Sequence, residues 1–427
     1  MDGNENPADD GGLDGIGRFR SDGTRLTRGD RRASTCLGAP PPLSEHRSRP
    51  LRRVLHVMGL NPGIKFGSLE EQVLQVARAF RERGGHFVPV FDAPLAGRTL
   101  AAYDAAGITV GALSLRRFEM STLHQLIQMI GLHQVELVNW SFYDPMSPYV
   151  WALSVIRPHV RHILTDHVSR YTQQHGNPSR MRRIVKTMLF PRYERIVCVS
   201  DFVKDVYARQ GIDGRTLSLR HFINTHRFRP DTQARQSLRR EFHADSRFVL
   251  LAVAHLIREK GIDVLLRALV QLPESVVAWI AGDGPARRDL ENLAQHLGLA
   301  RRVTFLGNQP EVQPYMQAAD CLVCPSVWEE ASGLVNIEAL ACGLPVVASR
   351  TGGIPEIVNH EVSGLLFAPG DAEGLGAAAR QLYERPDLRE SMSRAARRVA
   401  IERYSVESLM EEYLDLYRVP PPAGRTS

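Results

Sequence analysis

Short apolar runs alternate with segments of helical spacing along most of this chain, and this alternation constrains the fold more than any other feature. The strand-like run RRVLHVM is followed by a segment in which Leu69, Val73, Val76, Ala77 and Phe80 recur at helical spacing. Further short apolar runs follow, namely HFVPVF, ITVGAL, VELVNW, RHILT, RIVCVS and TLSLRHF. Such alternation is typical of a parallel sheet with helices on both faces.

A second series of the same kind begins after the stretch INTHRFRPDTQARQ, which breaks the pattern. Its apolar runs are FVLLAVA, VVAWIAG, RVTFLG, DCLVCP, PVVAS and GLLF, and helical segments such as GIDVLLRALVQL lie between them. The sequence therefore predicts an α/β protein with two Rossmann-like, doubly wound domains joined near residue 230. Two such domains imply a cleft between them.

The chain length agrees with two domains, since 427 residues exceed one ordinary core and a domain holds roughly 100–200 residues. Residues 1–50 contain too little apolar surface to offset the entropy of ordering, so we expect a disordered arm. The N-terminal domain is predicted at 51–229 and the C-terminal domain at 230–405. An amphipathic helix at 406–418 should pack back across the domain interface, and 419–427 should form a tail.

Composition places the chain among soluble globular proteins, with 43% hydrophobic and 23% charged residues. No apolar run approaches the roughly 18 residues that a membrane span needs. The first residues, MDGNENPADDGG, are acidic and lack the apolar core of a secretory signal. These observations predict a cytoplasmic protein. The formal charge of +6 is compatible with an anionic substrate or membrane surface, and we expect no nucleic acid partner.

Five cysteines, an odd number in a chain without an export signal, predict free thiols. Cys321 and Cys324 form one C-x-x-C, but a zinc site usually needs two more Cys or His ligands nearby. We therefore expect both on a buried strand. The chain also contains no D-x-D, and we expect neither a catalytic metal nor a cofactor.

The segment from Pro325 onward combines a strand end with a helix start. Ser332 is a plausible N-cap for a helix that would run from Gly333 to Cys342. Ligands usually bind at that edge of an open α/β sheet, and the free amides of Gly333, Leu334 and Val335 would suit a diphosphate.

Two glutamates, Glu330 and Glu338, flank this helix start. Glu338 lies five residues beyond Gly333, about 7–8 Å along the axis, which matches the separation of a diphosphate from its ribose hydroxyls. Glu330 would reach the sugar on the other side of the phosphates. The alternative is that both are solvated surface residues.

Here the chain resembles the E-x7-E family of retaining glycosyltransferases with the two-domain GT-B fold, the family 4 type also called glycosyl transferases group 1. The resemblance extends over most of residues 51–418. Ser332 replaces the usual Phe. The residues that match the family pattern are Pro325, Ser326, Glu330, Gly333, Leu334, Glu338, Ala339, Ala341, Gly343, Pro345, Val346, Val347 and Ala348.

The resemblance implies that Lys260, in AHLIREKG, neutralises a diphosphate leaving group. Lys260 is one of only four lysines among 53 basic residues, and its alternative role is a solvated loop cation. The family has an arginine where this chain has His255. Either His255 acts when protonated, or Arg258 supplies the second charge.

Three further positions carry weaker resemblances. In AGDGPAR, Gly282 and Gly284 would let the backbone approach the nucleotide, although a glycine turn occurs in any doubly wound domain. Gly67 would approach donor phosphates or acceptor in a turn where Ser68 replaces the family's second glycine. His167 matches a histidine beside the transferred sugar, although a lone histidine is often structural.

The resemblance implies transfer of a hexosyl or similar group from a nucleoside diphosphate sugar, with UDP or GDP favoured, to an acceptor hydroxyl in cell-surface polysaccharide or glycolipid synthesis. The configuration would be retained, and the departing diphosphate would take the acceptor proton. A sugar-nucleotide epimerase or hydrolase, or a non-catalytic nucleotide-sugar-binding partner, is the alternative.

The acceptor is not specified by any motif, and a lipid-linked acceptor is one candidate. The loops at residues 60–70 and 141–148 would choose it. Residues 179–195 have the pattern of a basic amphipathic helix, which would either lie on an anionic membrane or pack on its own sheet. If this helix lies on a membrane, the protein would be peripheral at the inner membrane face.

Overall fold

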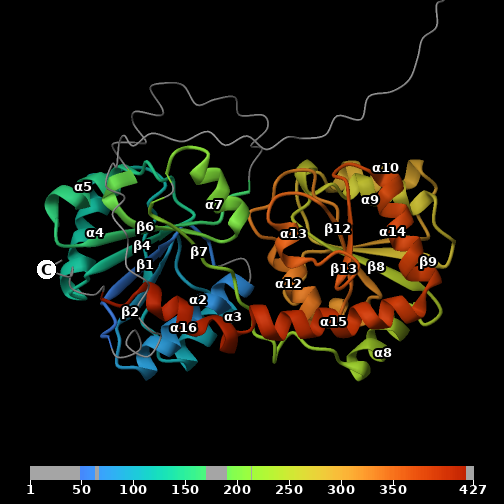
Figure 1. Cartoon of the computed structure of the whole chain (residues 1–427), viewed down its shortest axis with the longest axis horizontal. Helices are drawn as coiled ribbons and strands as arrows, with labels where there is room; N and C mark the ends of the chain where they lie inside the picture. The colour runs from blue at the N-terminus through green and yellow to red at the C-terminus, as the bar shows by residue number, and fades with distance from the viewer. Residues whose placement is uncertain (1–48, 63–66, 170–189, 213, 420–427) are drawn as a thin grey trace, which may run out of the picture. The chain divides into compact units, whose positions relative to one another are not determined.

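The computed structural model describes residues 49–62, 67–169, 190–212 and 214–419, and Figure 1 shows the arrangement of their helices and strands. These residues belong to one compact unit, Ser44–Ser427. Most of the predicted arm at 1–50 and nearly all of the tail at 419–427 lie outside the described residues. The basic segment 179–195 is described only from Phe190 onward. The helix predicted there cannot extend to residue 195, because the chain enters strand β6 (Tyr193–Cys198), which pairs with β5 (Arg161–Asp166).

Seven parallel strands of the described residues form the first sheet, in the order β3-β2-β1-β4-β5-β6-β7. Buried apolar clusters lie on both of its faces, which is why the central strands read as nearly continuous apolar runs. The strands are β1 (Val54–Met58), β2 (Phe87–Phe91), β3 (Gly111–Ala112), β4 (Leu137–Ser141), β5 (Arg161–Asp166), β6 (Tyr193–Cys198) and β7 (Thr216–Ser218).

Helices connect these strands, and the sheet with its helices is called the N-terminal lobe below. Of the apolar residues at helical spacing in α2, Val73, Val76, Ala77 and Phe80 are buried and Leu69 is half-buried. The helices are α2 (Ser68–Glu82), α3 (Gly97–Ala105), α4 (Met120–Leu132), α5 (Pro148–Ile156) and α7 (Asp201–Ala208), with a short 3-10 helix η1 (Phe190–Arg192).

Six parallel strands form the second sheet, in the order β10-β9-β8-β11-β12-β13. Central strand β8 pairs with β9 and β11. Buried clusters again lie on both faces. The strands are β8 (Phe248–Val253), β9 (Val276–Ala281), β10 (Val303–Gly307), β11 (Cys321–Cys324), β12 (Val346–Ser349) and β13 (Gly364–Phe367). The two sheets establish the predicted pair of Rossmann-like α/β domains.

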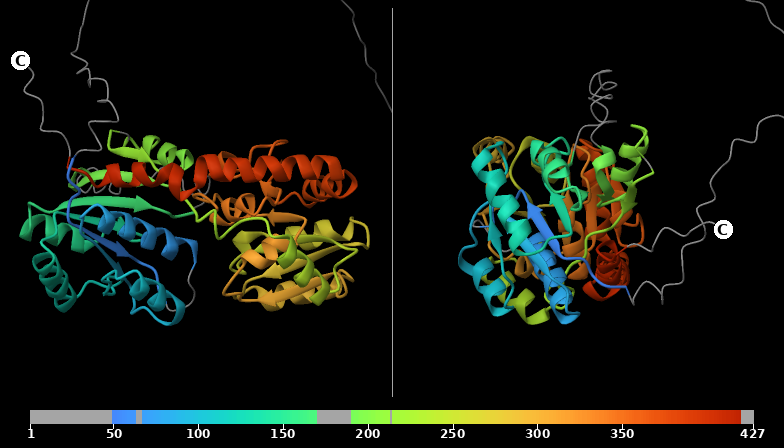
Figure 2. Two further views of the ribbon diagram at one scale, coloured as in Figure 1. Left: turned by 90° about the horizontal axis from the view of Figure 1, so that it is seen from below. Right: turned by 90° about the vertical axis from the view of Figure 1, so that its left-hand side faces the viewer.

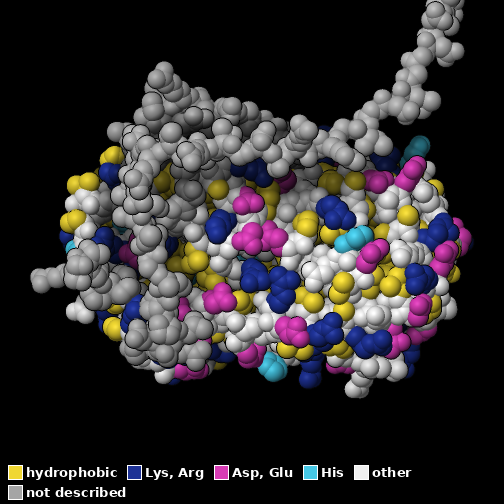
Figure 3. Space-filling view, in the orientation of Figure 1, with side chains coloured by type: hydrophobic (Ala, Val, Ile, Leu, Met, Phe, Trp, Pro, Cys, Tyr) yellow, Lys and Arg dark blue, Asp and Glu magenta, His cyan; other side chains and the backbone are white. Residues whose placement is uncertain are grey.

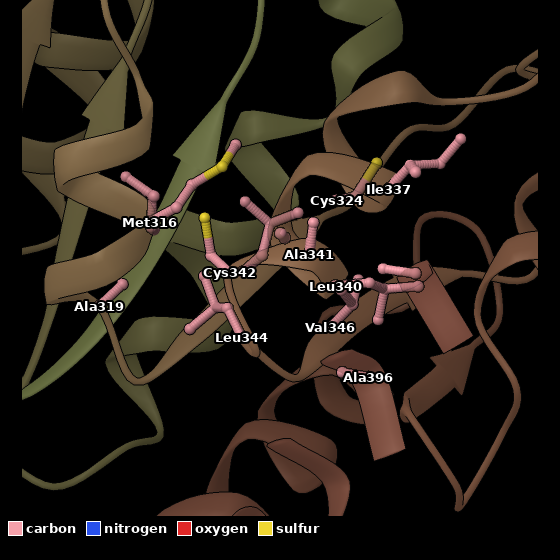
Figure 4. Close-up of a cluster of buried hydrophobic side chains, with 14 of the residues drawn as sticks. Met316, Ala319, Cys324, Ile337, Leu340, Ala341, Cys342, Leu344, Val346 and Ala396 are labelled. Atoms are coloured by element: carbon pink, nitrogen blue, oxygen red, sulfur yellow. The ribbon is translucent and has the colours of Figure 1, made fainter. Parts of the chain in front are cut away.

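This second sheet and its helices are called the C-terminal lobe. The helices are η2 (Arg258–Lys260, 3-10), α8 (Thr232–Glu241), α9 (Ile262–Val270), α10 (Arg287–His296), α11 (Gln313–Ala318), α12 (Leu334–Ala341), α13 (Ile354–Ile357), α14 (Ala372–Glu384) and α15 (Pro386–Tyr404). Apolar side chains of α12 pack into a buried cluster of this lobe, and Figure 4 shows Ile337, Leu340 and Ala341 among its members.

The cysteines that the structure describes are free and buried. Cys321 and Cys324 lie on β11, as the apolar pattern predicts. Burial raises the pKa of both thiols, so neither is poised to bind a metal as a thiolate. Within the described residues, no group of three or more His, Cys, Asp or Glu side chains could hold a metal ion.

The chain ends in two consecutive helices, α15 and α16 (Val406–Leu416), which Figures 1 and 2 show following one another. Helix α15 packs against α12 in the C-terminal lobe, whereas α16 packs against α2. Its residues Leu409, Met410, Tyr413 and Leu414 belong to a buried cluster of the N-terminal lobe. Ser405 separates the two helices, and its hydroxyl accepts from the Ser408 amide at the start of α16.

The described surface mixes charges of both signs. On the face shown in Figure 3, Lys and Arg side chains are interspersed with Asp and Glu side chains. Among the described residues, no helix is both long enough and apolar enough to span a bilayer.

Candidate active site

The loop after β11 leads into α12 through Gly333, which has a φ of +92°. A Cβ atom at Gly333 would lie 2.7 Å from the Asn336 side chain, so only glycine fits here. The predicted cap at Ser332 is therefore wrong: Gly333 is the N-cap and the helix begins at Leu334. The reason is that a left-handed turn at Gly333 separates Ser332 from the helix.

The start of α12 presents backbone donors. Among the described residues, no acceptor binds the N–H groups of Gly333, Leu334 or Val335. One residue further, the Asn336 side chain is completely buried. Its side-chain Nδ2 and Oδ1 have no hydrogen-bond partner among the described residues. Free amides at a helix N-terminus favour an anion, because the helix dipole adds partial positive charge.

Glu330 is buried, with 5% of its surface exposed. Its Oε1 accepts hydrogen bonds from Lys260 Nζ at 2.5 Å, Ser326 Oγ at 2.7 Å and Trp328 Nε1 at 3.1 Å. Its Oε2 accepts from Ser169 Oγ at 3.1 Å. Burial alone would raise the pKa of this carboxyl, but the charge of Lys260 and these hydrogen bonds lower it overall. Glu330 is therefore an ionised carboxylate at neutral pH.

Lys260 ends η2 and reaches Glu330 from the loop after β8. Gly261, directly after it, has a φ of +63°, and a Cβ there would lie 2.0 Å from the Pro325 carbonyl oxygen. The Val327 amide also donates to the Glu259 carbonyl at 2.9 Å. These backbone contacts hold the lysine loop against the loop that carries Glu330, which explains how residues 70 positions apart meet.

Glu338 lies on the second turn of α12 and is 9% exposed. Its Oε1 accepts from Ser68 Oγ at 2.5 Å. Ser68 is the first residue of α2, and Gly67 is the N-cap, its amide donating to the Glu70 carboxylate at 3.0 Å. The predicted donor-binding residues Glu338 and Gly67 are thus brought together, although they come from different lobes.

His255 lies in the exposed loop after β8, and its Nδ1 donates to the Asp283 carbonyl at 2.8 Å. That contact joins it to the loop of Gly282 and Gly284. A Cβ at Gly282 would lie 1.8 Å from the Ala254 carbonyl oxygen. Contact between protein backbones is therefore sufficient reason for glycine there. Arg258 is exposed, and among the described residues its side chain has no ion pair.

His167, after β5, does not contact Lys260 or Glu330. Its ring stacks on Phe142 with centroids 4.3 Å apart, and its Nδ1 lies 3.3 Å from His221 Nε2. Burial and then the neighbouring histidines His221 and His56 lower its pKa, so the ring is neutral at pH 7. It also lines a cavity of about 30 Å³ in the N-terminal lobe.

The structure therefore divides the predicted residues into groups. Lys260 and Glu330 form one cluster beside the start of α12, Glu338 meets the start of α2, and His255 joins the glycine loop. The sequence did not predict roles for Ser169, Trp328 or Asn336. Ser326 matched the family pattern, but the sequence did not predict its contact with Glu330. Ser68 was noted in the sequence only because it replaces a glycine of the family.

Two family models match the chain, one per half. Residues 69–227 match the model described as Glycosyltransferase Family 4, and residues 234–399 match Glycosyl transferases group 1. The lipopolysaccharide core biosynthesis glycosyltransferase LpsD of Rhizobium meliloti (strain 1021) is 36% identical over 170 residues, which is 40% of this chain and 49% of that protein. The chain thus spans about half the length of such curated relatives.

A longer match is the GDP-mannose-dependent alpha-(1-6)-phosphatidylinositol monomannoside mannosyltransferase of Mycolicibacterium smegmatis (strain ATCC 700084 / mc(2)155). It is 29% identical over 306 residues, 67% of this chain and 77% of that protein. Among solved structures, Anabaena HepE in complex with UDP has a TM-score of 0.73 at 21% identity, covering 85% of this chain and 99% of that one.

Two parallel-sheet Rossmann-like lobes of this kind define the GT-B fold. The chain belongs to the glycosyltransferase group 1 family, of the family 4 type.

Proposed function

We propose that this protein is a retaining glycosyltransferase that moves a sugar from a nucleoside diphosphate sugar to an acceptor hydroxyl. The observation that carries the proposal is the Lys260–Glu330 pair beside the unbonded amides at the start of α12, with Glu338 on the same helix. The cation and the backbone amides suit the diphosphate of such a nucleotide sugar, and the two carboxylates suit its ribose and sugar hydroxyls.

In the proposed mechanism, the amides of Leu334 and Val335 and the ammonium of Lys260 bind the diphosphate. Lys260 can do so while paired with Glu330, because an ammonium has three donors. These groups stabilise the charge that develops on the leaving diphosphate, and this electrostatic contribution dominates catalysis. The diphosphate takes the acceptor proton as the new glycosidic bond forms, so no protein nucleophile is needed.

The two carboxylates bind the remainder of the donor. Glu338 accepts hydrogen bonds from the ribose hydroxyls, and Glu330 accepts from sugar hydroxyls. His255 replaces the family's arginine, and it or Arg258 supplies the second charge at the diphosphate. Gly67 approaches the donor from the N-terminal lobe, and His167 lines the acceptor side near the transferred sugar.

The names of the relatives support a UDP or GDP sugar as donor and a polysaccharide or glycolipid as acceptor. The Mycolicibacterium relative is named for GDP-mannose and a phosphatidylinositol monomannoside, and LpsD for the lipopolysaccharide core. With a lipid-linked acceptor, the reaction would take place at the inner membrane face, where basic residues of segment 179–195 would bind anionic lipid. This part of the proposal rests on sequence alone.

A thermal-shift panel of UDP, GDP and ADP with their sugars tests the proposal. We expect one nucleotide series to raise the melting temperature, because a ligand that binds only the folded state stabilises it. No shift with any nucleotide would refute nucleotide-sugar binding. Rapid release of free nucleotide without any acceptor would favour an epimerase or hydrolase instead.

A further inference from the structure

One residue of the Glu330 segment is buried in the core of the other lobe. Ala331 is 2% exposed and belongs to a hydrophobic cluster whose other buried members all lie between Leu55 and Tyr207. An alanine of the C-terminal lobe thus completes a core of the N-terminal lobe.

The backbone of Ala331 is bound on both sides by serines of the N-terminal lobe. Its N–H donates to Ser169 Oγ at 3.1 Å, and its carbonyl accepts from Ser200 Oγ at 2.5 Å. Ser200 is also the N-cap of α7, accepting from the Val203 amide. The sequence did not predict either contact, because each serine lies more than 130 positions from Ala331.

Adjacent contacts connect the same two segments. The carboxylate of Glu356, on α13, accepts from the amides of Asp201 and Phe202 at the start of α7, at 2.8 and 2.7 Å. Gly353 packs so closely that an added Cβ would lie 2.6 Å from the Ala331 carbonyl oxygen. The position of the Glu330 loop is therefore set by the N-terminal lobe as well as by its own.

Ser169 extends this joint to the carboxylate itself. Since its oxygen accepts from the Ala331 amide, its proton is available for Glu330 Oε2, to which it donates at 3.1 Å. Among the described residues, the donors to the other oxygen, Oε1, all come from the C-terminal lobe, namely Lys260, Ser326 and Trp328. Thus Oε2 of Glu330 is bonded to the N-terminal lobe, and Oε1 is bonded to the C-terminal lobe.

We propose that Ser169 is a positioning residue that orients the Glu330 carboxylate toward the transferred sugar. This inference rests on the proposed function. The Ser169 hydroxyl fixes the rotation of the carboxylate. Lys260, Ser326 and Trp328 keep the carboxylate ionised and hold its other oxygen. Through this contact the acceptor-side lobe controls a donor-side group, so that Glu330 is aligned only where the two lobes meet.

Kinetics of Ser169→Ala with the preferred donor form the first test. We expect kcat to fall about tenfold, in line with losing one hydrogen bond to a charged group, while affinity for the free nucleoside diphosphate changes less than twofold. Ser169→Thr, which keeps the hydroxyl, should restore kcat. Unchanged kcat, or equal losses in nucleotide affinity and kcat without rescue by threonine, would overturn the proposal.

A spectroscopic test does not depend on activity. The Trp328 indole N–H donates to Glu330, so its 15N–1H resonance reports the orientation of the carboxylate. We expect Ser169→Ala to shift this resonance and to leave the resonance of Trp279, in the C-terminal core, unmoved. The control is Ser275→Ala, which removes a hydroxyl of the C-terminal lobe that is bonded to Tyr383. It should move neither resonance. An unmoved Trp328 resonance would refute the positioning role.

The two tests separate the claims. If Trp328 shifts in Ser169→Ala but the wild-type protein transfers no sugar, the proposed function fails and the orienting contact stands. If the wild-type protein is active and Trp328 does not shift, only the inference about Ser169 fails.

Discussion

At the residue scale, the site depends on a buried carboxylate beside a lysine. Glu330 keeps its charge although only 5% of its surface is exposed, because Lys260, Ser326 and Trp328 compensate the loss of water. The rarity of lysine and the E-x7-E spacing drew attention to Lys260, Glu330 and Glu338 in the sequence, and the structure pairs Lys260 with Glu330. Their serine partners were not, since a serine acquires such a role only through contacts between distant segments.

Replacing Lys260 with Ala should lower kcat by about 10²–10³-fold, the usual cost of removing one donor that stabilises developing negative charge. Lys260→Arg, which keeps the charge with a different geometry, should lose less. Steady-state kinetics measure both, with a thermal melt to establish folding. A kcat for the alanine variant within twofold of wild type would contradict the leaving-group role.

Buried His56 should make the protein less stable in mild acid. Burial lowers its pKa from 6.5 to about 3, so between these values the unfolded chain binds a proton that the folded chain does not. Stability contributed by the neutral ring is therefore complete above pH 6.5 and falls as pH decreases below it, by about 1.4 kcal/mol per pH unit.

Urea unfolding at pH 7 and pH 5 checks this effect. The wild-type loss between these pH values should exceed that of His56→Gln by about 2 kcal/mol. The exposed His124 on α4 offers a matched control, and His124→Gln should behave like wild type. Equal losses in wild type and His56→Gln would show that His56 does not stay neutral.

At the element scale, the apolar runs predicted every strand now seen in the described residues. The signal is strongest for the central strands, which are buried on both faces, whereas edge strands such as β3 and β7 are half-exposed. The start of α12 was predicted less well. Ser332 has the right chemistry for a cap, but Gly333 turns the chain with positive φ, and the sequence pattern does not reveal a backbone angle. The same limit applies to Gly282, whose contact with Ala254 only the folded chain shows.

Gly261 should be essential for the placement of η2. Gly261→Ala incurs both left-handed strain and a clash with the Pro325 carbonyl, whereas Gly298 has a similar φ of +73° and open space around it. We expect Gly298→Ala to cost about 1 kcal/mol and Gly261→Ala to cost clearly more, with loss of nucleotide binding. Urea unfolding of both variants tests this, and equal costs would contradict a steric role.

At the scale of the whole molecule, α16 joins the last residues of the chain to the N-terminal lobe. Tyr413 accepts from Gln72 on α2 at 2.5 Å and donates to the Arg220 carbonyl at 2.9 Å. The amphipathic pattern of this helix was evident in the sequence, and we propose that its packing keeps the lobes in register. Which surface it covers could not be read from a periodicity that shows only that one face is apolar.

Leu414→Ala should therefore destabilise the protein by about 2–5 kcal/mol, the range for deleting a buried leucine side chain, since Leu414 is completely buried in the cluster beneath α16. Ile401→Ala on α15, where the isoleucine is 44% exposed, should cost much less. Chemical unfolding measures both. A small cost for Leu414→Ala would indicate that α16 is loosely attached.

The proposed donor site depends on Glu338, whose carboxylate would bind the ribose while accepting a hydrogen bond from Ser68 of the other lobe. Isothermal titration of wild type and Glu338→Gln with the nucleoside diphosphate chosen by the thermal-shift panel tests this most directly. We expect at least about tenfold weaker binding in Glu338→Gln, the cost of losing a charged acceptor. Equal affinity in the two proteins would contradict it.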